Sequence, residues 1–229
     1  MKKFLKKIKL ISDEKKAIKE LLDNKNTLLK QCIFLNTHSY VETLKNIDFM
    51  KSVLASKYIF VDGIGISLVS KIFFKKLDIN RIAGYDFFET LLTNINNLKL
   101  EKKLFFIGGE IDNLKNLKKK ILEEYKNIKS ENISFLSPPF GNDFKFKDQD
   151  IIEKINNFNP NIIFIGLGAP KQEIWSYLNK KKLKCVNFVN IGAAFNFFTG
   201  LEKRAPFFLR KNGFEWLFRL LITPRKIYK

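Results

Sequence analysis

Short apolar runs alternate with amphipathic segments along most of the chain. Most of the runs lack the regular alternation of apolar and polar residues that a half-exposed strand shows. Strands covered on both faces, as in parallel sheets, have this continuous apolar pattern. The runs that predict strands lie at residues 7–11, 32–36, 58–62, 103–108, 162–166 and 185–192, with a weaker one at 133–137.

Helical patterns fill the intervals between these runs. The first begins with acidic residues, which suit the first turn of a helix, and most of the others follow a glycine. These segments are residues 13–24, 66–73, 85–96, 112–125 and 150–158, with a further helix after the sequence GLGAPKQ. A strand followed by a helix, repeated, predicts a doubly wound, Rossmann-like α/β fold with a mostly parallel sheet. Ligands of such folds bind outside the carboxyl ends of the strands.

The composition divides the chain into two parts. The 229 residues are 45% hydrophobic, which is enough to bury the core of one substantial domain. Residues 200–229 differ from the rest, with eight Lys or Arg against two Glu and with large apolar residues such as Phe207 and Trp216 in between. We therefore predict an α/β domain over 1–199 and a C-terminal appendage of two short helices, divided at 212–213.

The appendage has two possible roles. A basic helix with aromatic residues on its apolar side is typical of a segment that lies in a membrane interface. The alternative is a helix pair docked on the domain, with its basic residues only solvated. The net charge of +19 would attract anionic lipid, nucleic acid or phosphorylated molecules. The abundance of Lys, Asn, Ile and Phe along the whole chain accounts for part of that charge.

Other features bear on location and redox state. No run approaches the ~18–20 uncharged apolar residues of a membrane-spanning helix, and charges interrupt the apolar residues of 1–16, unlike a signal peptide. We expect a cytoplasmic protein with peripheral membrane contact. Cys32 and Cys185 lie in apolar runs and predict buried, reduced thiols. A single histidine argues against a metal site built from histidines.

Polar residues mark the ends of two successive predicted strands. Asp62 precedes Gly63, and a partly desolvated carboxylate there could act as a general base or cap the next helix. Asn36 could orient a hydroxyl or a sugar amide, or make an ordinary turn. His38 is expected in a loop.

The most distinctive segment is GLGAPKQE, residues 166–173. Its glycines allow the backbone to approach a ligand closely, and the N-terminus of the helix that follows suits an anion. A phosphate-bearing ligand is the first candidate, although the spacing fits neither a GxGxxG fingerprint nor a Walker loop. The residues of this segment and of the other glycine turn that we expect to bind the ligand are Gly108, Gly109, Gly166, Gly168, Lys171 and Gln172.

Two further polar sets each allow two interpretations. Arg81 and Asp86 flank Gly84. An arginine can pair with a phosphate through two hydrogen bonds, whereas Asp86 is expected to cap a helix. The sequence Asp148-x-Asp150 resembles motifs that hold a divalent ion, but an acidic first turn of the following helix explains it without a metal. We favour the interpretation of Asp148 and Asp150 as the acidic start of a helix.

Seven segments occur together in an order and spacing typical of one family. They are LN at 35–36, VDGIGISL at 61–68, RIAGYDFFETLL at 81–92, FFIGG at 105–109, P-x-IIFIGLGAPKQEIW at 160–175, NIGAAFNFFTG-x-x-KRAP at 190–206 and NGFEWLFRLLITPRK at 212–226. Together they resemble the WecG/TagA/CpsF family of bacterial glycosyltransferases.

The resemblance implies an inverting, metal-independent transferase without a cofactor. Such an enzyme moves an N-acetylmannosamine-type sugar from a UDP donor to N-acetylglucosamine on a polyprenyl diphosphate, during assembly of teichoic acid, common antigen or capsule. It acts at the inner face of the bacterial plasma membrane, where the appendage would contact anionic lipid. No nucleic-acid partner is expected. Whether the chain forms a homo-oligomer stays open on sequence alone.

The resemblance also assigns roles by position. Asp62 matches the catalytic base of the family, and Asn36 matches an active-site residue beside it. Arg81 and Gln172 match residues near the donor diphosphate and sugar. Arg219 matches a basic residue of the appendage that closes over the diphosphate.

The chain departs from the family pattern at four positions. Phe34 stands where the family often has Thr, so Thr37 is a candidate to replace it in catalysis. Asn196 replaces an acidic residue of the nucleotide pocket; it can still bond a ribose or base, which leaves the donor less certain. Lys226 and Lys229 stand where Arg is common, which keeps the charge and loses the bidentate fork.

Two other functions stay open on sequence alone. A nucleotide-dependent oxidoreductase would fit a Rossmann-like fold, but no dinucleotide-binding loop precedes Asp62. A nucleic-acid-binding protein would fit the charge, but no RNP, helix-turn-helix or zinc pattern is present.

Overall fold

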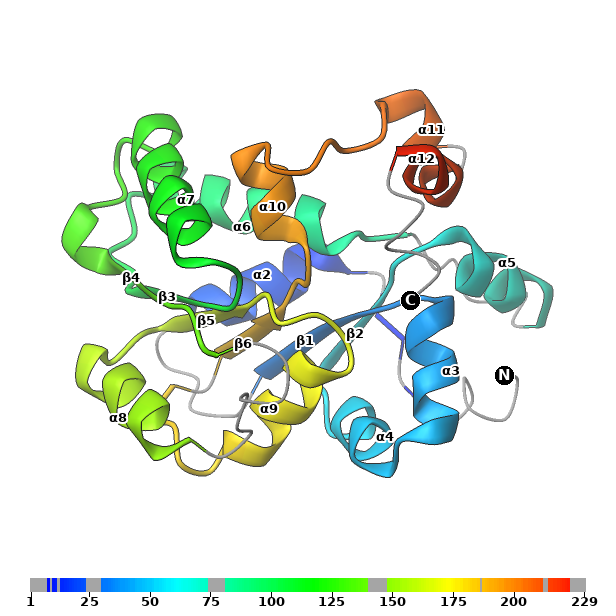
Figure 1. The fold of residues 1–229 in the computed structure, drawn as a ribbon, viewed down its shortest axis with the longest axis horizontal. Coiled ribbons are helices and arrows are strands. Elements are labelled where there is room, and N and C mark those ends of the chain that lie inside the picture. Colours follow the sequence, from blue (N-terminus) through cyan, green and yellow to red (C-terminus); the bar gives the residue numbers. More distant parts are fainter. Residues whose placement is uncertain are drawn as a thin grey trace.

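A parallel sheet forms the centre of the molecule. The computed structural model describes residues 8, 10–11, 13–23, 30–73, 81–139, 148–185, 187–211 and 214–222. Within these residues the parallel strands run in the order β2-β1-β6-β5-β3-β4 (Figure 1). The strands are β1 (Lys30–Leu35), β2 (Tyr58–Val61), β3 (Leu104–Ile107), β4 (Ile133–Leu136), β5 (Ile162–Ile165) and β6 (Asn187–Asn190). The predicted Rossmann-like α/β fold is confirmed.

Helices cover both faces of the sheet (Figure 1). One face packs against α2 (Glu14–Leu22), α6 (Gly84–Asn97), α7 (Ile111–Glu124) and α10 (Ala194–Thr199). The other face packs against α4 (Ile47–Leu54), α8 (Gln149–Phe158) and α9 (Lys171–Asn179). The remaining helices are α3 (Thr37–Lys45), α5 (Ile64–Phe73), α11 (Phe207–Lys211) and α12 (Glu215–Ile222), with a 3-10 turn at Ser130–Asn132.

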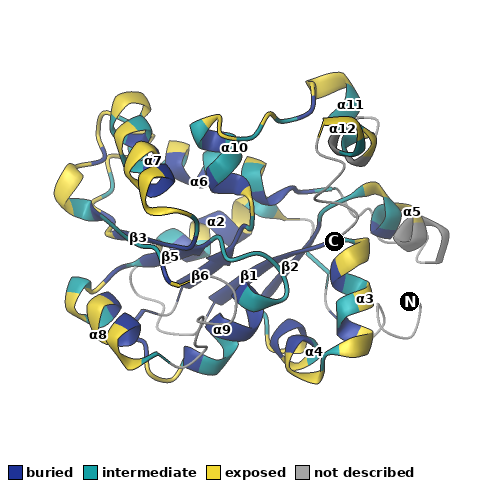
Figure 2. Cartoon of the chain, in the orientation of Figure 1, coloured by how far each residue is buried: buried dark blue, intermediate teal, exposed yellow. Residues whose placement is uncertain are grey.

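Burial on both faces explains the continuous apolar runs. Successive side chains of a strand point to opposite sides. In β1, Ile33 and Leu35 join the cluster that includes α4, whereas Phe34 stacks on Phe60 and contacts Phe87, with 5.4 Å between ring centroids in each pair. Figure 2 shows the strands buried between helices whose outer sides are exposed.

Three helices, α3, α4 and α10, were not predicted. α3 buries Ser39 and Thr43 in place of an apolar stripe, so it lacks the hydrophobic period by which the other helices were recognised. The side chains of Asn36 and Asn46 accept backbone N–H groups and so cap α3 and α4. His38 therefore lies in a helix, and the expectation of a loop is wrong.

The chain ends agree with the predictions as far as they are described. Leu10 makes an isolated parallel bridge with Ile59, within the run predicted as a strand at 7–11. The appendage forms two short helices, α11 and α12, as expected. Within the described residues every helix is too short or too polar to cross a bilayer. Cys32 and Cys185 are buried free thiols, as predicted.

Candidate active site

Two adjoining cavities open at the carboxyl edge of the sheet. The first, of about 510 Å³, is lined by the segments that follow β1, β2 and β6, and by the start of α6. The second, of about 570 Å³, is lined by the segments that follow β3, β5 and β6. Gly168, Gly192 and Ala193 line both cavities. Parallel sheets bind their ligands at this edge.

The structure divides the predicted site residues between the two cavities. The first is lined by Asn36, Thr37, Asp62, Arg81, Gly168 and Gln172, and the second by Gly109, Gly166, Gly168, Lys171 and Asn196. Gly108 lines neither cavity. Its φ of +112° and a distance of 2.6 Å from an ideal Cβ to the carbonyl carbon of Gly166 show that it lets two loops cross. The side chain of Arg219 lies outside the described part of the structure.

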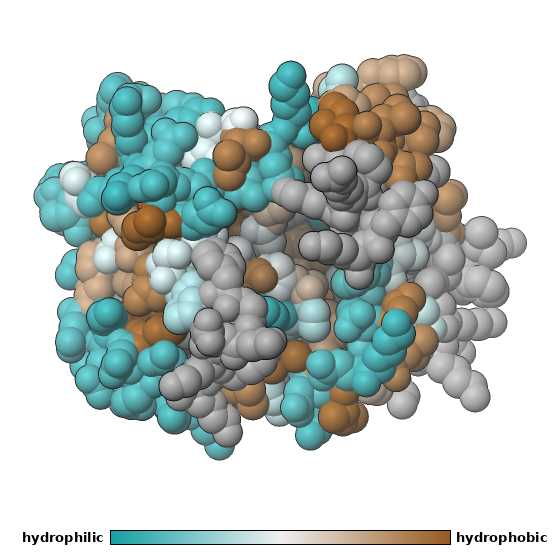
Figure 3. Space-filling model, in the orientation of Figure 1, coloured by the Kyte–Doolittle hydropathy of each residue, from teal (hydrophilic) through white to brown (hydrophobic). Residues whose placement is uncertain are grey.

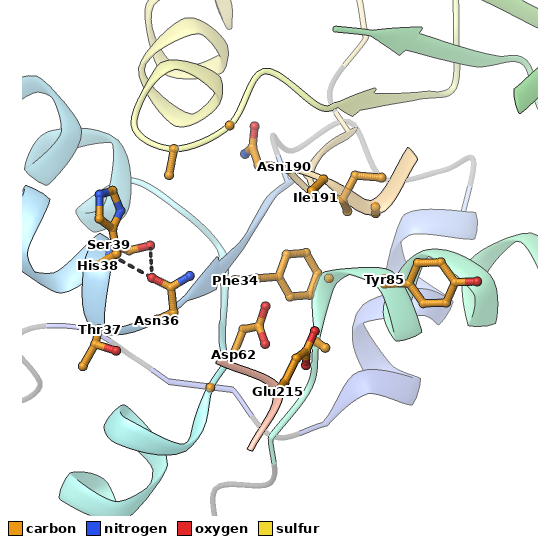
Figure 4. Close-up of a pocket in the computed structure, with 18 of the residues that line it drawn as sticks. Phe34, Asn36, Thr37, His38, Ser39, Asp62, Tyr85, Asn190, Ile191 and Glu215 are labelled. Atoms are coloured by element: carbon orange, nitrogen blue, oxygen red, sulfur yellow. Dashed lines mark hydrogen bonds between the residues drawn. The ribbon is translucent and has the colours of Figure 1, made fainter. Parts of the chain in front are cut away.

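Asp62 presents its carboxylate to the first cavity. Its backbone N–H donates to the Leu35 carbonyl at 2.9 Å, so the residue directly continues β2 beside β1. The side chain is 30% exposed, and Oδ1 lies 3.7 Å from Arg81 Nη2. Figure 4 shows the carboxylate between Phe34 and Glu215, facing the open space. A ligand can therefore reach this carboxylate.

Asn36 is both a helix cap and a wall of the first cavity. Its Oδ1 accepts hydrogen bonds from the Ser39 N–H at 2.9 Å and the Ser39 hydroxyl at 3.1 Å. Figure 4 shows the amide nitrogen on the side away from Ser39, where it can donate to a ligand. Thr37 lines the same cavity, and His38 is largely exposed, with Nε2 3.8 Å from Glu42 Oε1.

The C-terminal helices hold Arg81. Its Nη1 donates to the Arg210 carbonyl at 2.6 Å, and its Nη2 donates to Glu215 Oε2 at 2.6 Å. Glu215 also lines the first cavity. Arg81 was predicted to bind a phosphate. In the structure its guanidinium forms an ion pair with the Glu215 carboxylate and lies 3.7 Å from Asp62 Oδ1.

A second arginine pair fixes the appendage to α6. Arg204 donates from Nη1 and Nη2 to the two carboxylate oxygens of Asp86, at 2.6 and 2.8 Å, and its guanidinium lies 4.2 Å from the centre of the Tyr85 ring. The N-cap of α6 is Ala83, so the expectation that Asp86 caps this helix is wrong. Asp86 lies in the first turn, where its carboxylate forms a bidentate pair with the arginine.

The amide of Gln172 joins two loops. Its Oε1 accepts from the Gly168 N–H at 3.2 Å and from the Gly192 N–H at 3.0 Å. Its Nε2 donates to Glu173 Oε1 at 2.8 Å. Gln172 therefore lines the first cavity, but both polar atoms of its side chain bond to the protein. The oxygen joins the loops of Gly168 and Gly192, and the nitrogen bonds to Glu173. Burial raises the pKa of the Glu173 carboxyl to about 7.

Asn196 belongs to a polar network beside the second cavity. Its Nδ2 donates to Glu202 Oε1 and its Oδ1 accepts from Asn113 Nδ2, both at 2.8 Å. Lys171, at the start of α9, lines the same cavity and adds positive charge.

The acidic pair at the start of α8 has a structural role. Asp148 Oδ1 accepts from the N–H groups of Asp150 and Ile151, at 3.0 and 3.4 Å, and so caps the helix. This agrees with the helical interpretation of the sequence. Across the described residues, no three His, Cys, Asp or Glu side chains are grouped so that they could hold a metal ion.

Comparison with known proteins identifies the family. Residues 8–229 match the glycosyl transferase WecG/TagA/CpsF family. The chain belongs to this glycosyltransferase family. A relative from Bacillus subtilis (strain 168) is 32% identical over 182 residues, which cover 79% of this chain and 67% of the relative. A relative from Bacillus spizizenii is 31% identical over 185 residues, which cover 81% and 68% of the two chains.

A third relative comes from Staphylococcus aureus (strain NCTC 8325 / PS 47). It is 25% identical over 182 residues, which cover 78% of this chain and 66% of the relative. All three relatives are named N-acetylglucosaminyldiphosphoundecaprenol N-acetyl-beta-D-mannosaminyltransferase. This glycosyltransferase thus matches about two thirds of the length of each of them.

Three residues that line the first cavity of the candidate site were not predicted, namely Glu173, Arg204 and Glu215. Each lies within a motif that pointed to the family, so a signal was present. Glu215 is one of only two acidic residues in 200–229, which sets it apart from its basic surroundings. Arg204 and Glu215 have partners more than 100 positions away, at Asp86 and Arg81, which no local pattern reveals.

Proposed function

We propose that this enzyme is an inverting transferase of an N-acetylmannosamine-type sugar. The donor is a UDP-sugar, and the acceptor is N-acetylglucosamine on a polyprenyl diphosphate, in the assembly of a cell-surface polysaccharide. The observation that carries the proposal is the Asp62 carboxylate, which lines an open cavity between Asn36 and Arg81. The names of the relatives support the acceptor and the sugar.

Asp62 acts as the general base. It takes the proton of the acceptor hydroxyl while the oxygen forms a bond to the anomeric carbon of the donor sugar. The bond from that carbon to the diphosphate oxygen breaks, and its electron pair leaves with UDP. Attack on the face opposite the leaving group inverts the anomeric centre. A well-placed base contributes about 10²–10⁴-fold to the rate, and Asn36 orients the reacting hydroxyl or the sugar amide.

Fixed positive charge stabilises the leaving diphosphate. Arg81 is the guanidinium next to Asp62, and it retains donors for a ligand because its contacts with Arg210 and Glu215 do not use all five N–H groups. Its buried Nε has no hydrogen-bond partner among the described residues. The N-termini of α6 and α9 carry no side-chain cap bond and add dipoles at the same edge. These groups can neutralise the charge that develops on UDP.

The second cavity holds the nucleoside part of the donor. It adjoins the first cavity at Gly168 and Gly192, so a diphosphate at that boundary can connect a sugar on one side to a nucleoside on the other. Asn196 and Lys171 supply polar contacts there. Both lie on the rim of this cavity in positions that a ribose or a base could reach.

The appendage over 200–229 is the membrane-associating part. Phe207, Phe208 and Leu221 are 69%, 72% and 75% exposed, although Arg81 and Asp86 fix this part to the domain through polar ties. Figure 3 shows apolar side chains gathered where α11 and α12 lie in Figure 1. Apolar side chains among basic residues suit an anionic lipid surface. The enzyme then works peripherally at the inner face of the plasma membrane, where its lipid-linked acceptor resides.

A donor screen tests the proposal. The protein is incubated with UDP-sugars, one at a time, and with a short-chain lipid diphosphate that carries N-acetylglucosamine. We expect UDP-N-acetylmannosamine or a close relative to give a lipid-linked disaccharide, identified by its mass, with a β linkage by NMR. Folded protein that binds no UDP and yields no disaccharide with any donor would contradict the proposal. A change in NAD(P)H absorbance on turnover would favour an oxidoreductase instead.

A further inference from the structure

Glu173 is an acidic residue of the first cavity that the proposed reaction does not use. The residue is 3% exposed, yet it lines the cavity. Its Oε1 accepts from Gln172 Nε2 at 2.8 Å, whereas Oε2 is buried and has no hydrogen-bond partner in the described structure. A buried carboxyl with an unsatisfied oxygen costs stability. A residue that carries such a cost at the edge of a site is a candidate for a functional role.

The neighbours of Gln172 determine the orientation of its amide. Both groups that face its Oε1 are backbone N–H donors, from Gly168 and Gly192. An amide has an acceptor end and a donor end. With the oxygen committed to the two glycines, the nitrogen must find an acceptor on the opposite side, and Glu173 Oε1 supplies it.

The two glycines lie where small shifts would change both cavities. Gly168 follows β5 and Gly192 follows β6, and both line both cavities. Their φ values of +77° and +56° belong to the left-handed region, which glycine adopts with little strain. The Gln172 amide therefore sets the spacing of two loops at the boundary between the cavities.

The backbone of Glu173 is anchored separately from its side chain. Its carbonyl accepts from the Ser176 hydroxyl at 3.0 Å and from Gln31 Nε2 at 3.4 Å. The Ser176 bond lies within α9, whereas Gln31, which also donates to the Ser176 hydroxyl at 2.8 Å, ties α9 to β1 inside the core. The carboxyl instead accepts from Gln172 Nε2, so the roles of backbone and side chain can be separated by mutation.

We propose that Glu173 is a positioning residue for donor binding. Its carboxyl orients the Gln172 amide, and the amide holds the loops of Gly168 and Gly192 at the spacing that the donor diphosphate requires. The identity of the donor rests on the proposed function, whereas the hydrogen-bonded chain from Glu173 to the two glycines does not.

The neutral form of Glu173 suits this role. An anionic diphosphate in the same cavity would repel an ionised carboxylate. Because burial raises its pKa to about 7, the protonated form is well populated at neutral pH. A proton on Oε2 leaves Oε1 able to accept from Gln172. The other titratable side chains that line this cavity are His38, Asp62, Arg81, Tyr85, Arg204 and Glu215.

Three variants separate orientation from stability. Glu173→Gln keeps an acceptor for Gln172 and removes the charge, whereas Glu173→Leu removes the acceptor. Ser176→Ala is the matched control, because it weakens the anchoring of the same helix and leaves the carboxyl in place. The measurements are the dissociation constant of UDP by calorimetry and the amide hydrogen exchange of peptides that contain Gly168 and Gly192. Glu173→Met replaces the leucine variant if that variant does not fold.

The proposal predicts a clear order among the variants. Glu173→Leu should weaken UDP binding about tenfold or more and speed exchange at both glycines, whereas Glu173→Gln and Ser176→Ala stay within about threefold of the parent in UDP affinity. Normal affinity and exchange in Glu173→Leu would overturn the proposal, as would equal damage in Glu173→Gln or Ser176→Ala. If the parent itself binds no UDP, the proposed function fails, and the exchange data still test the link from Glu173 to the loops.

Discussion

The Arg81 guanidinium donates a hydrogen bond to the Glu215 carboxylate at 2.6 Å, across 134 positions of the sequence. Arg81 also lies 3.7 Å from Asp62, so this contact connects α12 to the proposed catalytic base. Both carboxylates line the first cavity (Figure 4), and both lie within 4 Å of the Arg81 guanidinium, at 3.7 Å for Asp62 and 2.6 Å for Glu215. The C-terminal helices are therefore part of the candidate site.

Glu215→Ala should loosen the C-terminal helices and lower turnover. A hydrogen bond between charged groups contributes about 1.5–3 kcal/mol when it is largely shielded from water, and its loss should speed tryptic cleavage after Lys203 and Arg204 about tenfold or more. Limited proteolysis of the folded protein measures this. Glu202→Gln is the control, because a glutamine can still accept from Asn196. Equal cleavage of Glu215→Ala and the parent would show that the contact does not hold the appendage.

The strands and their ends were predictable from local sequence. Burial on both faces leaves a continuous apolar run, and a polar residue after such a run marks the edge where ligands bind. The pairing of Leu35 with Val61 then brings Asn36 and Asp62 to neighbouring strand ends. Simple geometry of parallel sheets was sufficient for this part of the site.

The ties between distant segments were not predictable in this way. Asp86 lies in a helical first turn, where a carboxylate is favourable whatever its partner. Only the folded chain shows that the Asp86 carboxylate pairs with Arg204, which lies 118 positions away. The helix α3 was missed for a related reason, because its buried side chains, Ser39 and Thr43, are polar.

The double variant Phe207→Ser, Phe208→Ser should bind less tightly to vesicles that contain anionic lipid. Both side chains are exposed on α11, and the removal of two large apolar groups from a lipid interface should reduce partitioning about tenfold or more. Sedimentation with vesicles measures the bound fraction. Leu44→Ser serves as the control, since Leu44 is similarly exposed on α3. Undiminished binding of the double variant would remove the appendage as the membrane contact.

Glu173 should make stability fall as the pH rises. Its pKa is raised from 4.5 in the unfolded chain to about 7 in the folded protein. The folded state therefore holds a proton that the unfolded state has lost, so this stabilisation is complete below pH 4.5 and disappears as the pH passes 7. The difference is on the order of 3 kcal/mol. Glu173→Gln has no proton to lose at this position and should lack this slope.

Urea unfolding at about pH 5 and pH 8 tests this, with the parent and Glu173→Gln side by side. The contributions of all other groups cancel in the difference between the two proteins. The same change in unfolding free energy in both proteins would contradict the raised pKa.

Asp148→Ala should behave as the loss of a helix cap. We expect the free energy of unfolding to fall by about 1 kcal/mol, with UDP affinity unchanged, since Asp148 Oδ1 bonds to the first turn of α8.

Removal of divalent metal ions with EDTA should leave turnover unaltered. Strong inhibition by EDTA that Mg²⁺ or Mn²⁺ reverses would point instead to Asp148 and Asp150 as metal ligands.

The most direct test of the account is single-turnover transfer by Asp62→Asn, with UDP affinity measured on the same preparation. Asparagine keeps the shape of the side chain and cannot accept the proton of the acceptor hydroxyl. We predict that the rate of sugar transfer falls about 10²–10⁴-fold while the dissociation constant of UDP stays within about threefold of the parent. A transfer rate close to that of the parent would contradict the assignment of Asp62 as the base.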